Sequence, residues 1–332
     1  MPPPDPDLRT ENGLSPTPSP SLAKDEPQSR CALVTGATGF VGAHLVEGLL
    51  NRGWRVVAVG RRERAEDLRE PDAWLRLSYL DLPVEALAGV DVLFHQAALN
   101  DTLETDEARV HEVNVRGSRR LFEAALAQGC GRIVYASSMA VYGDAPVPLR
   151  EDGPARPLNA YGRSKLAMEQ MALELAAGTS GQGGRAPVVV GLRYGNVYGC
   201  HEEHKGAMAS MVTRLAHQMR EGDPTLFADG FQRRDFVHVD DVVRANLLAV
   251  DAPRSTVVNV GSGTAVRFNE LVALLNRVLG TERRPRYDKN PHADCYQTEV
   301  VLDLARARRE LGYEPAVTLE EGLDRCFAFA KL

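Results

Sequence analysis

The ordered part of the chain opens with CALVTGATGFVG at residues 31–42, an apolar run that stops at a glycine-rich turn. Apolar residues then recur at helical spacing from Val41 to Leu50, and Gly53 is a helix stop. Residues 55–59 form a second apolar run, typical of a buried strand. This order predicts a strand, a glycine turn, a helix and a second strand.

Glycines in such a turn let the backbone approach a pyrophosphate, which then lies at the helix N-terminus. The glycines stand three apart, at Gly36, Gly39 and Gly42, and not in the G-x-G-x-x-G spacing of most dinucleotide dehydrogenases. We expect the turn to bind a dinucleotide through these glycines and through Phe40 and Val41.

The end of the second strand bears on which nicotinamide cofactor is bound. NAD sites usually place an acid here to accept the ribose 2′-hydroxyl, but this chain has Gly60-Arg61-Arg62. Guanidinium groups suit a 2′-phosphate through charge and bidentate geometry. The sequence therefore predicts NADP through Arg61 and Arg62, with NAD as the alternative.

Strand-like and helical runs alternate as far as residue 192. Further strands are predicted at residues 75–80, 90–94, 132–136 and 187–192. Helices are predicted at residues 104–128 and 161–177. The alternation predicts an α/β fold with a doubly wound, Rossmann-like parallel sheet, and ligands gather at the carboxyl ends of such strands.

Composition changes at two points of the chain and divides it into three parts. Residues 1–29 are rich in Pro and Ser and read as a disordered tail, and residues 30–195 as the dinucleotide-binding domain. After residue 195 the alternation breaks down, so residues 196–332 are expected to be mainly a smaller substrate-binding lobe. Its predicted elements are helices at 208–219, 268–279 and 319–329 and strands within 227–241 and at 257–260.

The composition of the 332-residue chain excludes several classes of partner. A net charge of -6 gives no reason to expect nucleic acid or an anionic membrane as a partner. No apolar run reaches the ~18 residues that a membrane span needs. The five cysteines are scattered, with no close Cys/His cluster, so we expect reduced thiols, no metal site and a cytoplasmic protein.

Tyr161 and Lys165 stand four apart in the last predicted helix of the first domain and therefore share one helix face. A free tyrosine titrates near pH ~10, too high for a base at neutral pH. A neighbouring ammonium can lower that pKa by roughly 1–3 units, and an oxidised nicotinamide ring would lower it further. The pair is thus a candidate proton-transfer device beside a hydride-transfer cofactor.

The ordered set of motifs resembles the extended short-chain dehydrogenase/reductase superfamily, and within it the nucleotide-sugar epimerases. The resemblance runs from the glycine turn through Ser138 and the Tyr161–Lys165 pair to the Arg234-Asp235-Phe236 segment. It implies that Ser138, Tyr161 and Lys165 are catalytic, and that Lys165 holds the nicotinamide ribose and depresses the tyrosine pKa. It also implies homo-oligomers and further cofactor contacts from Asp81, Ala97, Ala98, Asn114 and Val197.

A narrower resemblance, to the ADP-glyceromanno-heptose 6-epimerases, rests on PLNAY at residues 157–161 and HKGAMAS at residues 204–210. In those enzymes the lysine of the His-Lys-Gly loop, here Lys205, is a second acid/base opposite the tyrosine. Epimerisation oxidises a carbinol to a ketone and returns the hydride to its other face. Because the oxygen changes position between the two steps, one acid/base cannot lie within ~3 Å of both positions.

The same resemblance implies that a nucleotide-diphosphate sugar is the substrate. The substrate contacts that it implies are Asn196, Arg214, Phe227, Arg234 and Tyr296. The chain departs from the heptose enzymes at Ala207 and Arg214, where they usually have Ser and His, and at Gly60, which replaces an acid. The segment between Phe227 and Arg234 is also one residue shorter.

Other activities share part of this motif set. A UDP-hexose 4-epimerase would need Ser138, Tyr161 and Lys165 but not Lys205, and an NADPH-dependent short-chain reductase would share the first half only. A 4,6-dehydratase would carry Asp-Glu after Ser138, where this chain has Met139-Ala140. A non-catalytic dinucleotide sensor would normally have lost the Ser/Tyr/Lys set.

Overall fold

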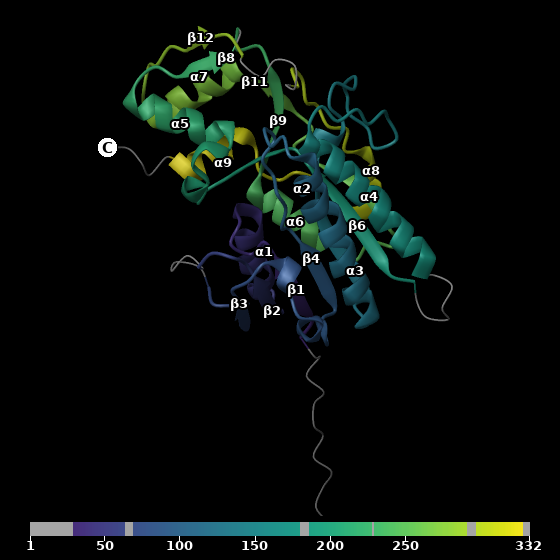
Figure 1. The fold of residues 1–332 in the computed structure, drawn as a ribbon. Coiled ribbons are helices and arrows are strands. Elements are labelled where there is room, and N and C mark those ends of the chain that lie inside the picture. The colour runs from purple at the N-terminus through teal and green to yellow at the C-terminus, as the bar shows by residue number, and fades with distance from the viewer. Residues whose placement is uncertain (1–28, 64–68, 180–185, 228, 291–296, 328–332) are drawn as a thin grey trace, which may run out of the picture.

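The computed structural model describes residues 29–63, 69–179, 186–227, 229–290 and 297–327. It consists of a large lobe built on a parallel sheet and a smaller lobe beyond the carboxyl ends of the strands (Figure 1). None of the helices in these ranges is long and apolar enough to cross a membrane.

The central sheet has seven strands in the order β10-β6-β5-β4-β1-β2-β3, all parallel. Their bounds are β1 (Cys31–Thr35), β2 (Arg55–Val59), β3 (Ala73–Leu75), β4 (Val92–His95), β5 (Arg132–Ser138), β6 (Val188–Tyr194) and β10 (Thr256–Val260). The chain starts in the middle of the sheet, winds to one edge and then to the other. The predicted doubly wound parallel sheet is therefore confirmed.

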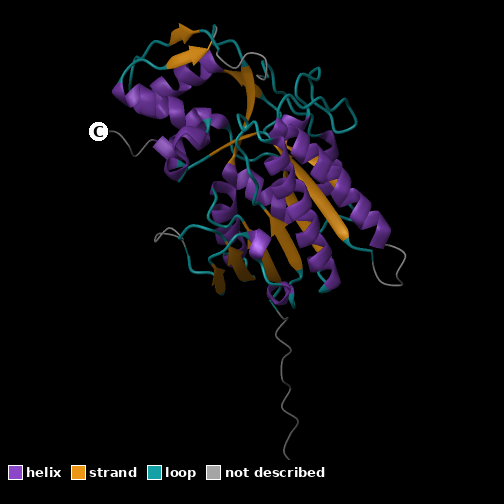
Figure 2. Cartoon of the chain, viewed as in Figure 1, coloured by secondary structure: helices purple, strands orange, loops and turns teal. Residues whose placement is uncertain are grey.

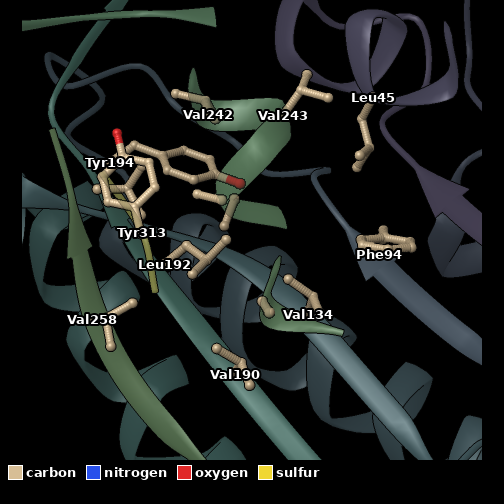
Figure 3. Packing of buried hydrophobic residues seen from close by; sticks show 14 of the residues in the cluster. Leu45, Phe94, Val134, Val190, Leu192, Tyr194, Val242, Val243, Val258 and Tyr313 are labelled. Atoms are coloured by element: carbon tan, nitrogen blue, oxygen red, sulfur yellow. The ribbon is translucent and has the colours of Figure 1, made fainter. Parts of the chain in front are cut away.

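Helices cover both faces of this sheet, which explains why its strands read as unbroken apolar runs. Ala32 and Val34 face one core with α1 (Phe40–Leu50) and α6 (Val239–Ala249), whereas Leu33 faces the other. Val190 and Val258 lie in the first of these clusters (Figure 3). The opposite face is covered by α3 (Ser118–Ala127) and α4 (Ala160–Thr179).

The smaller lobe holds the remaining sheets and a core of its own (Figure 2). A three-stranded sheet runs β11-β9-β7 and a two-stranded sheet pairs β12 with β8. Their bounds are β7 (Asn196–Tyr198), β8 (Thr225–Phe227), β9 (Arg233–His238), β11 (Ala265–Arg267) and β12 (Arg286–Asp288). The helices of this lobe are α5 (Met211–Glu221), α7 (Phe268–Leu279) and α9 (Leu319–Phe327). The two other α-helices, α2 (Glu107–His111) and α8 (Ala305–Leu311), pack against α4 and β10 of the large lobe.

Gly195 is the only residue between β6 of the central sheet and β7 of the smaller lobe. Its N–H donates to the Val260 carbonyl at 2.9 Å. A Cβ at this position would lie 3.1 Å from the Asp235 carbonyl oxygen, so the junction is closely packed. The two sheets are thus joined by a short connection.

The structure differs from the predicted elements in several places. The third strand covers Ala73–Leu75 and not residues 75–80, because Ser78 caps a short 3₁₀ turn, η1 (Tyr79–Asp81). The predicted helix over 104–128 is α2, a π-helical segment η3 (Glu112–Gly117) and α3. Helices α6 and α8 were not predicted, and β10, from the range assigned mainly to the substrate lobe, completes the central sheet. The division at residue 195 itself stays a prediction.

Candidate active site

The glycine turn between β1 and α1 forms a backbone cradle. Gly36 has φ +69°, and a Cβ there would lie 2.7 Å from the Ala97 backbone nitrogen. A Cβ at Gly42 would lie 2.2 Å from the Gly36 carbonyl oxygen, so helix and turn touch directly. At Gly39 the only neighbour within 4 Å of a Cβ would be that same oxygen, at 3.1 Å.

The N-terminus of α1 has the properties of an anion site. No side chain caps it, and its first turn carries no acidic residue. Exposed N–H groups and the helix dipole favour a phosphate at such a position. The turn therefore fits the pyrophosphate of a dinucleotide, held by the backbone around Gly39, Phe40 and Val41.

The remaining predicted cofactor residues of the first half border this turn or lie on loops nearby. Arg61 and Arg62 are exposed, and the Arg62 Nη2 donates to the Thr38 carbonyl of the turn at 2.6 Å. Ala97 and the adjoining Ala98 are half-buried at the carboxyl end of β4. Asp81 is exposed at the end of η1 and not at a strand end.

Asn114 is buried and fully bonded within the protein. Its Oδ1 accepts from the Leu99 N–H at 2.8 Å, and its Nδ2 donates to the Leu99 carbonyl and to the Ser164 Oγ at 2.9 and 3.0 Å. It thereby ties the loop after β4 to α4, at a residue between Tyr161 and Lys165. Its side chain supports the site through Ser164.

Ser138, Tyr161 and Lys165 lie together at the end of β5 and the start of α4. Ser138 hydrogen-bonds the Tyr161 side chain and also accepts from the Ala140 N–H at 3.1 Å. The Lys165 Nζ donates to the Ala136 carbonyl at 2.7 Å and lies 5.7 Å from the centroid of the Tyr161 ring. The structure thus brings these three residues together, although 27 positions separate Ser138 from Lys165 in the sequence.

Burial dominates the protonation of this group in the protein alone. It raises the pKa of Tyr161 to about 12, against a smaller lowering by the hydrogen bond with Ser138. It lowers the pKa of Lys165 to about 8, against a raising effect of Glu169. In the protein without ligands burial thus outweighs other effects on the Tyr161 pKa, and the Lys165 ammonium is directed to the Ala136 carbonyl. That Lys165 depresses the tyrosine pKa beside a bound cofactor stays a prediction. A positive ring bound next to Tyr161 would act in the opposite direction to burial.

Lys205 lies in the 3₁₀ segment η5 (Glu203–Met208) and close to the glycine turn. Its Nζ is 4.9 Å from the centroid of the Phe40 ring and 2.7 Å from the Glu202 Oε1. The Glu202 carboxylate is fully buried and also accepts from the Ser210 N–H and the Thr213 Oγ1, at 3.2 and 2.7 Å. A buried carboxylate therefore fixes the Lys205 ammonium beside the start of α1.

The predicted substrate residues fall into different environments. Asn196 presents a buried Oδ1 that has no hydrogen-bond partner, as expected of a group that awaits a ligand. Phe227 is half-buried at the end of β8, and Arg214 is exposed on α5. Val197, predicted to contact the cofactor, is half-buried in β7, whereas Tyr296 lies outside the described residues.

Arg234 is buried and bonded to the backbone. Its Nη1 donates to the Thr298 carbonyl at 3.2 Å and its Nη2 donates to the Gln297 carbonyl. Gln297 in turn donates from its Nε2 to the Gly143 carbonyl at 2.8 Å, in the segment after the carboxyl end of β5. Arg234 therefore holds the segment that connects the two lobes, in addition to any contact with a diphosphate.

Two polar arrangements around the site were missing from the sequence analysis. Buried His95 accepts or donates at both ring nitrogens, 2.8 Å from the Thr35 Oγ1 and 2.9 Å from the Ser118 Oγ. Glu169, one turn after Lys165 on α4, forms a buried ion pair with Arg193. The four-residue spacing of Lys165 and Glu169 indicates that they share one helix face. It does not indicate that Glu169 pairs with Arg193, which lies on β6.

Comparisons with known proteins agree with this geometry. Residues 32–261 match the model of the NAD dependent epimerase/dehydratase family. An ADP-L-glycero-D-manno-heptose-6-epimerase of Cupriavidus pinatubonensis is 38% identical over 327 residues, which cover 88% of this chain and 96% of the relative.

Solved structures of two such enzymes superpose on most of the chain. The UDP-glucose 4-epimerase of Thermotoga maritima, with UDP-glucose, has a TM-score of 0.81 at 32% identity, over 90% of this chain and 98% of the other. The Helicobacter pylori ADP-L-glycero-D-manno-heptose-6-epimerase has a TM-score of 0.78 at 32% identity, over 90% and 96%. The chain therefore belongs to the NAD-dependent epimerase/dehydratase family, whose nicotinamide cofactor fits the glycine turn described above.

Proposed function

We propose that this protein inverts one carbinol of a nucleotide-diphosphate sugar, by oxidation to a ketone and reduction on the opposite face, most like an ADP-glyceromanno-heptose 6-epimerase. The observation that carries the proposal is the grouping of Ser138, Tyr161 and Lys165 beside a glycine turn that fits a dinucleotide. The bound nicotinamide supplies the acceptor, and then the donor, of the hydride. The similarity to ADP-heptose and UDP-glucose epimerases supports the choice of substrate class.

The residues of the chain divide the proton transfers between them in this proposal. Tyr161 takes the proton of the substrate hydroxyl in one half of the reaction, with the Ser138 hydroxyl bonded to it. Lys165 holds the nicotinamide ribose. Lys205, held in place by the Glu202 carboxylate, donates a proton to the ketone oxygen after the ketone has turned over.

We also propose NADP as the cofactor. Arg62 is anchored on the Thr38 carbonyl of the turn, and the residue directly after β2 is Gly60 and not an acid that could accept a ribose 2′-hydroxyl. Two exposed guanidinium groups at this place favour a 2′-phosphate. Asn196, with its unpaired Oδ1, is the proposed contact to the sugar.

A UDP-hexose 4-epimerase is the second candidate, because the structure superposes on the Thermotoga maritima enzyme with a TM-score of 0.81. This activity needs Tyr161 and Lys165 but not Lys205. The departures at Ala207 and Arg214 from the heptose enzymes lie in the smaller lobe, where the sugar would bind.

The test is incubation with a panel of ADP-, UDP-, GDP- and dTDP-sugars, with the product stereochemistry determined by NMR. Inversion of the ADP-heptose would support the first proposal. Inversion only at C4 of a UDP-hexose would move the function to the second candidate. Steady consumption of free NADPH with a carbonyl substrate, and no inversion of any sugar, would identify a reductase and reject both.

A further inference from the structure

A buried ion pair involves Glu169, which lies one helical turn after Lys165 on α4. The Arg193 Nε and Nη2 donate to the Glu169 Oε1 and Oε2 at 2.9 and 2.7 Å, and the two side chains are 7% and 4% exposed. The Ser137 Oγ also donates to the Glu169 Oε1. The Glu169 carboxylate thus joins α4, which carries Lys165, to the carboxyl ends of β5 and β6.

Stability is a weak reason for a chain to keep such a pair. Taking both charges out of water costs as much as their attraction returns, and apolar residues of similar size often replace a buried pair without loss. The placement indicates another role. The Lys165 Nζ bonds to Ala136, which is the neighbour of Ser137, so both side chains of α4 attach to the same end of β5.

Glu169 is the charge that opposes the effect of burial on Lys165. The other groups that face the pair from the surrounding elements are Arg193 on β6, Tyr135 on β5, His95 on β4, Tyr142 in the turn after β5, Tyr161 on α4 and, beyond Arg193, Glu151. Burial keeps His95 neutral and raises the pKa of the tyrosines, so they supply no negative charge near neutral pH. The guanidinium of Arg193 holds the Glu169 carboxylate in place.

We propose that Glu169, anchored by Arg193 and Ser137, is a positioning residue that keeps the Lys165 ammonium charged and directed toward the nicotinamide ribose. The inference rests on the proposed function for the role of Lys165. It does not depend on which sugar is the substrate.

Burial and the Glu169 charge act on the pKa of Lys165 in opposite directions. Burial brings the pKa of Lys165 to about 8, so the ammonium is charged below this pH and lost above it. Without the Glu169 charge we expect the pKa of Lys165 to fall by roughly one unit, as for the removal of a neighbouring opposite charge. The ammonium would then lose its proton at a lower pH. Neutral Lys165 would hold the ribose less well.

The first test observes Lys165 itself, without substrate. The chain has only five lysines, at positions 24, 165, 205, 289 and 331, so ¹³Cε-lysine labelling produces few NMR signals. The signal absent from Lys165→Arg is that of Lys165. We expect its titration to move down by roughly one pH unit in Glu169→Gln, and not to move in Glu174→Gln, which removes an exposed carboxylate of the same helix.

A double variant separates tuning from folding, because Glu169→Gln leaves a buried guanidinium without its partner. Glu169→Gln/Arg193→Met removes both charges and should keep the fold. We expect the Lys165 titration and the alkaline limb of the pH–rate profile still to lie about one unit lower than in the wild type. A Lys165 titration unchanged in the double variant would overturn the proposal and leave the pair as a structural tie. If the titration shifts but no sugar of the panel is inverted, the proposed function fails, whereas the effect of Glu169 on the Lys165 ammonium stands.

Discussion

At the scale of single residues, Tyr161 is the group on which the proposed chemistry depends. Its hydroxyl forms a hydrogen bond with Ser138. We expect Tyr161→Phe to lower the inversion rate by roughly 10²–10⁴ while the cofactor stays bound, because only the proton carrier is removed. The control is Tyr287→Phe, at an exposed position in β12, which should keep the wild-type inversion rate. NMR of the product measures both, and equal rates for the two variants would exclude Tyr161 as the acid/base.

Lys205 provides the second prediction at this scale. Its ammonium is fixed between the Glu202 carboxylate and the Phe40 ring, next to the turn that fits the cofactor. We expect Lys205→Ala to reduce the inversion rate by roughly 10²–10⁴ without loss of cofactor, since the acid/base for one of the two positions of the substrate oxygen is removed. The control is Lys289→Ala, at an exposed lysine after β12. Wild-type inversion by Lys205→Ala would reject the two-base proposal and favour a 4-epimerase.

At the scale of elements, the β1–α1 turn depends on Gly42. A Cβ there would lie 2.2 Å from the Gly36 carbonyl, and backbone on both sides cannot move aside. We expect Gly42→Ala to cost roughly 1–3 kcal/mol and to weaken cofactor binding, because the cradle around Gly39 would open. Gly178→Ala is the matched control, since a Cβ in this part of α4 has no neighbour within 4 Å. Thermal unfolding and titration calorimetry measure the two effects, and a Gly42→Ala protein as stable as the control would contradict the packing argument.

The connection after β2 provides the test of cofactor choice. The Arg62 guanidinium is anchored on the Thr38 carbonyl, beside the expected ribose of the cofactor. We expect Arg62→Ala to raise the Kd for NADP about tenfold and to change the Kd for NAD little, since one charge-assisted contact to the 2′-phosphate is lost. Arg76→Ala, a 59% exposed side chain near the same edge, is the control. Equal losses for both cofactors would show that Arg62 does not discriminate between them.

At the scale of the whole molecule, buried histidines predict how stability depends on pH. Burial lowers the pKa of His95 to about 3 and also lowers those of His44 and His238. Each group is neutral in the folded protein, so its stabilising effect is complete above the unfolded pKa near ~6.5 and is lost as pH falls toward the folded pKa. We expect the urea midpoint to fall steadily from pH 7 to pH 5. In His95→Gln the fall should be shallower, and an identical slope would rule out His95 as a source of the effect.

Much of the large lobe could be predicted from sequence because its signals are local. Runs such as Leu33–Val34 and Val189–Val190 are apolar on both faces of a buried parallel strand, and the glycine turn follows directly after the first of them. Helix α6 was missed although Val242, Val243 and Leu247 keep helical spacing, because it follows β9 without a break. The π-helical segment was missed because no sequence pattern distinguishes it from an α-helix.

The parts of the site that sequence could not predict depend on contacts between distant elements. Nothing around Lys205 indicates that it lies over Phe40, since 165 positions separate the two residues. The pairing of Glu169 with Arg193 likewise exists only once α4 packs against β6. Burial also reversed the expected direction of the Tyr161 pKa, because the residue types were known but their exposure to water was not.

The short junction at Gly195 has a consequence for how the two lobes can move. With one residue between β6 and β7, the junction acts as a stiff joint, and the Val260 carbonyl bonded to its N–H holds it from the side. Asn196 therefore moves with the central sheet, and its unpaired Oδ1 keeps a constant distance from the end of β6. A sugar that enters between the lobes would meet Asn196 at a fixed position, so its shape would have to fit this wall from the start.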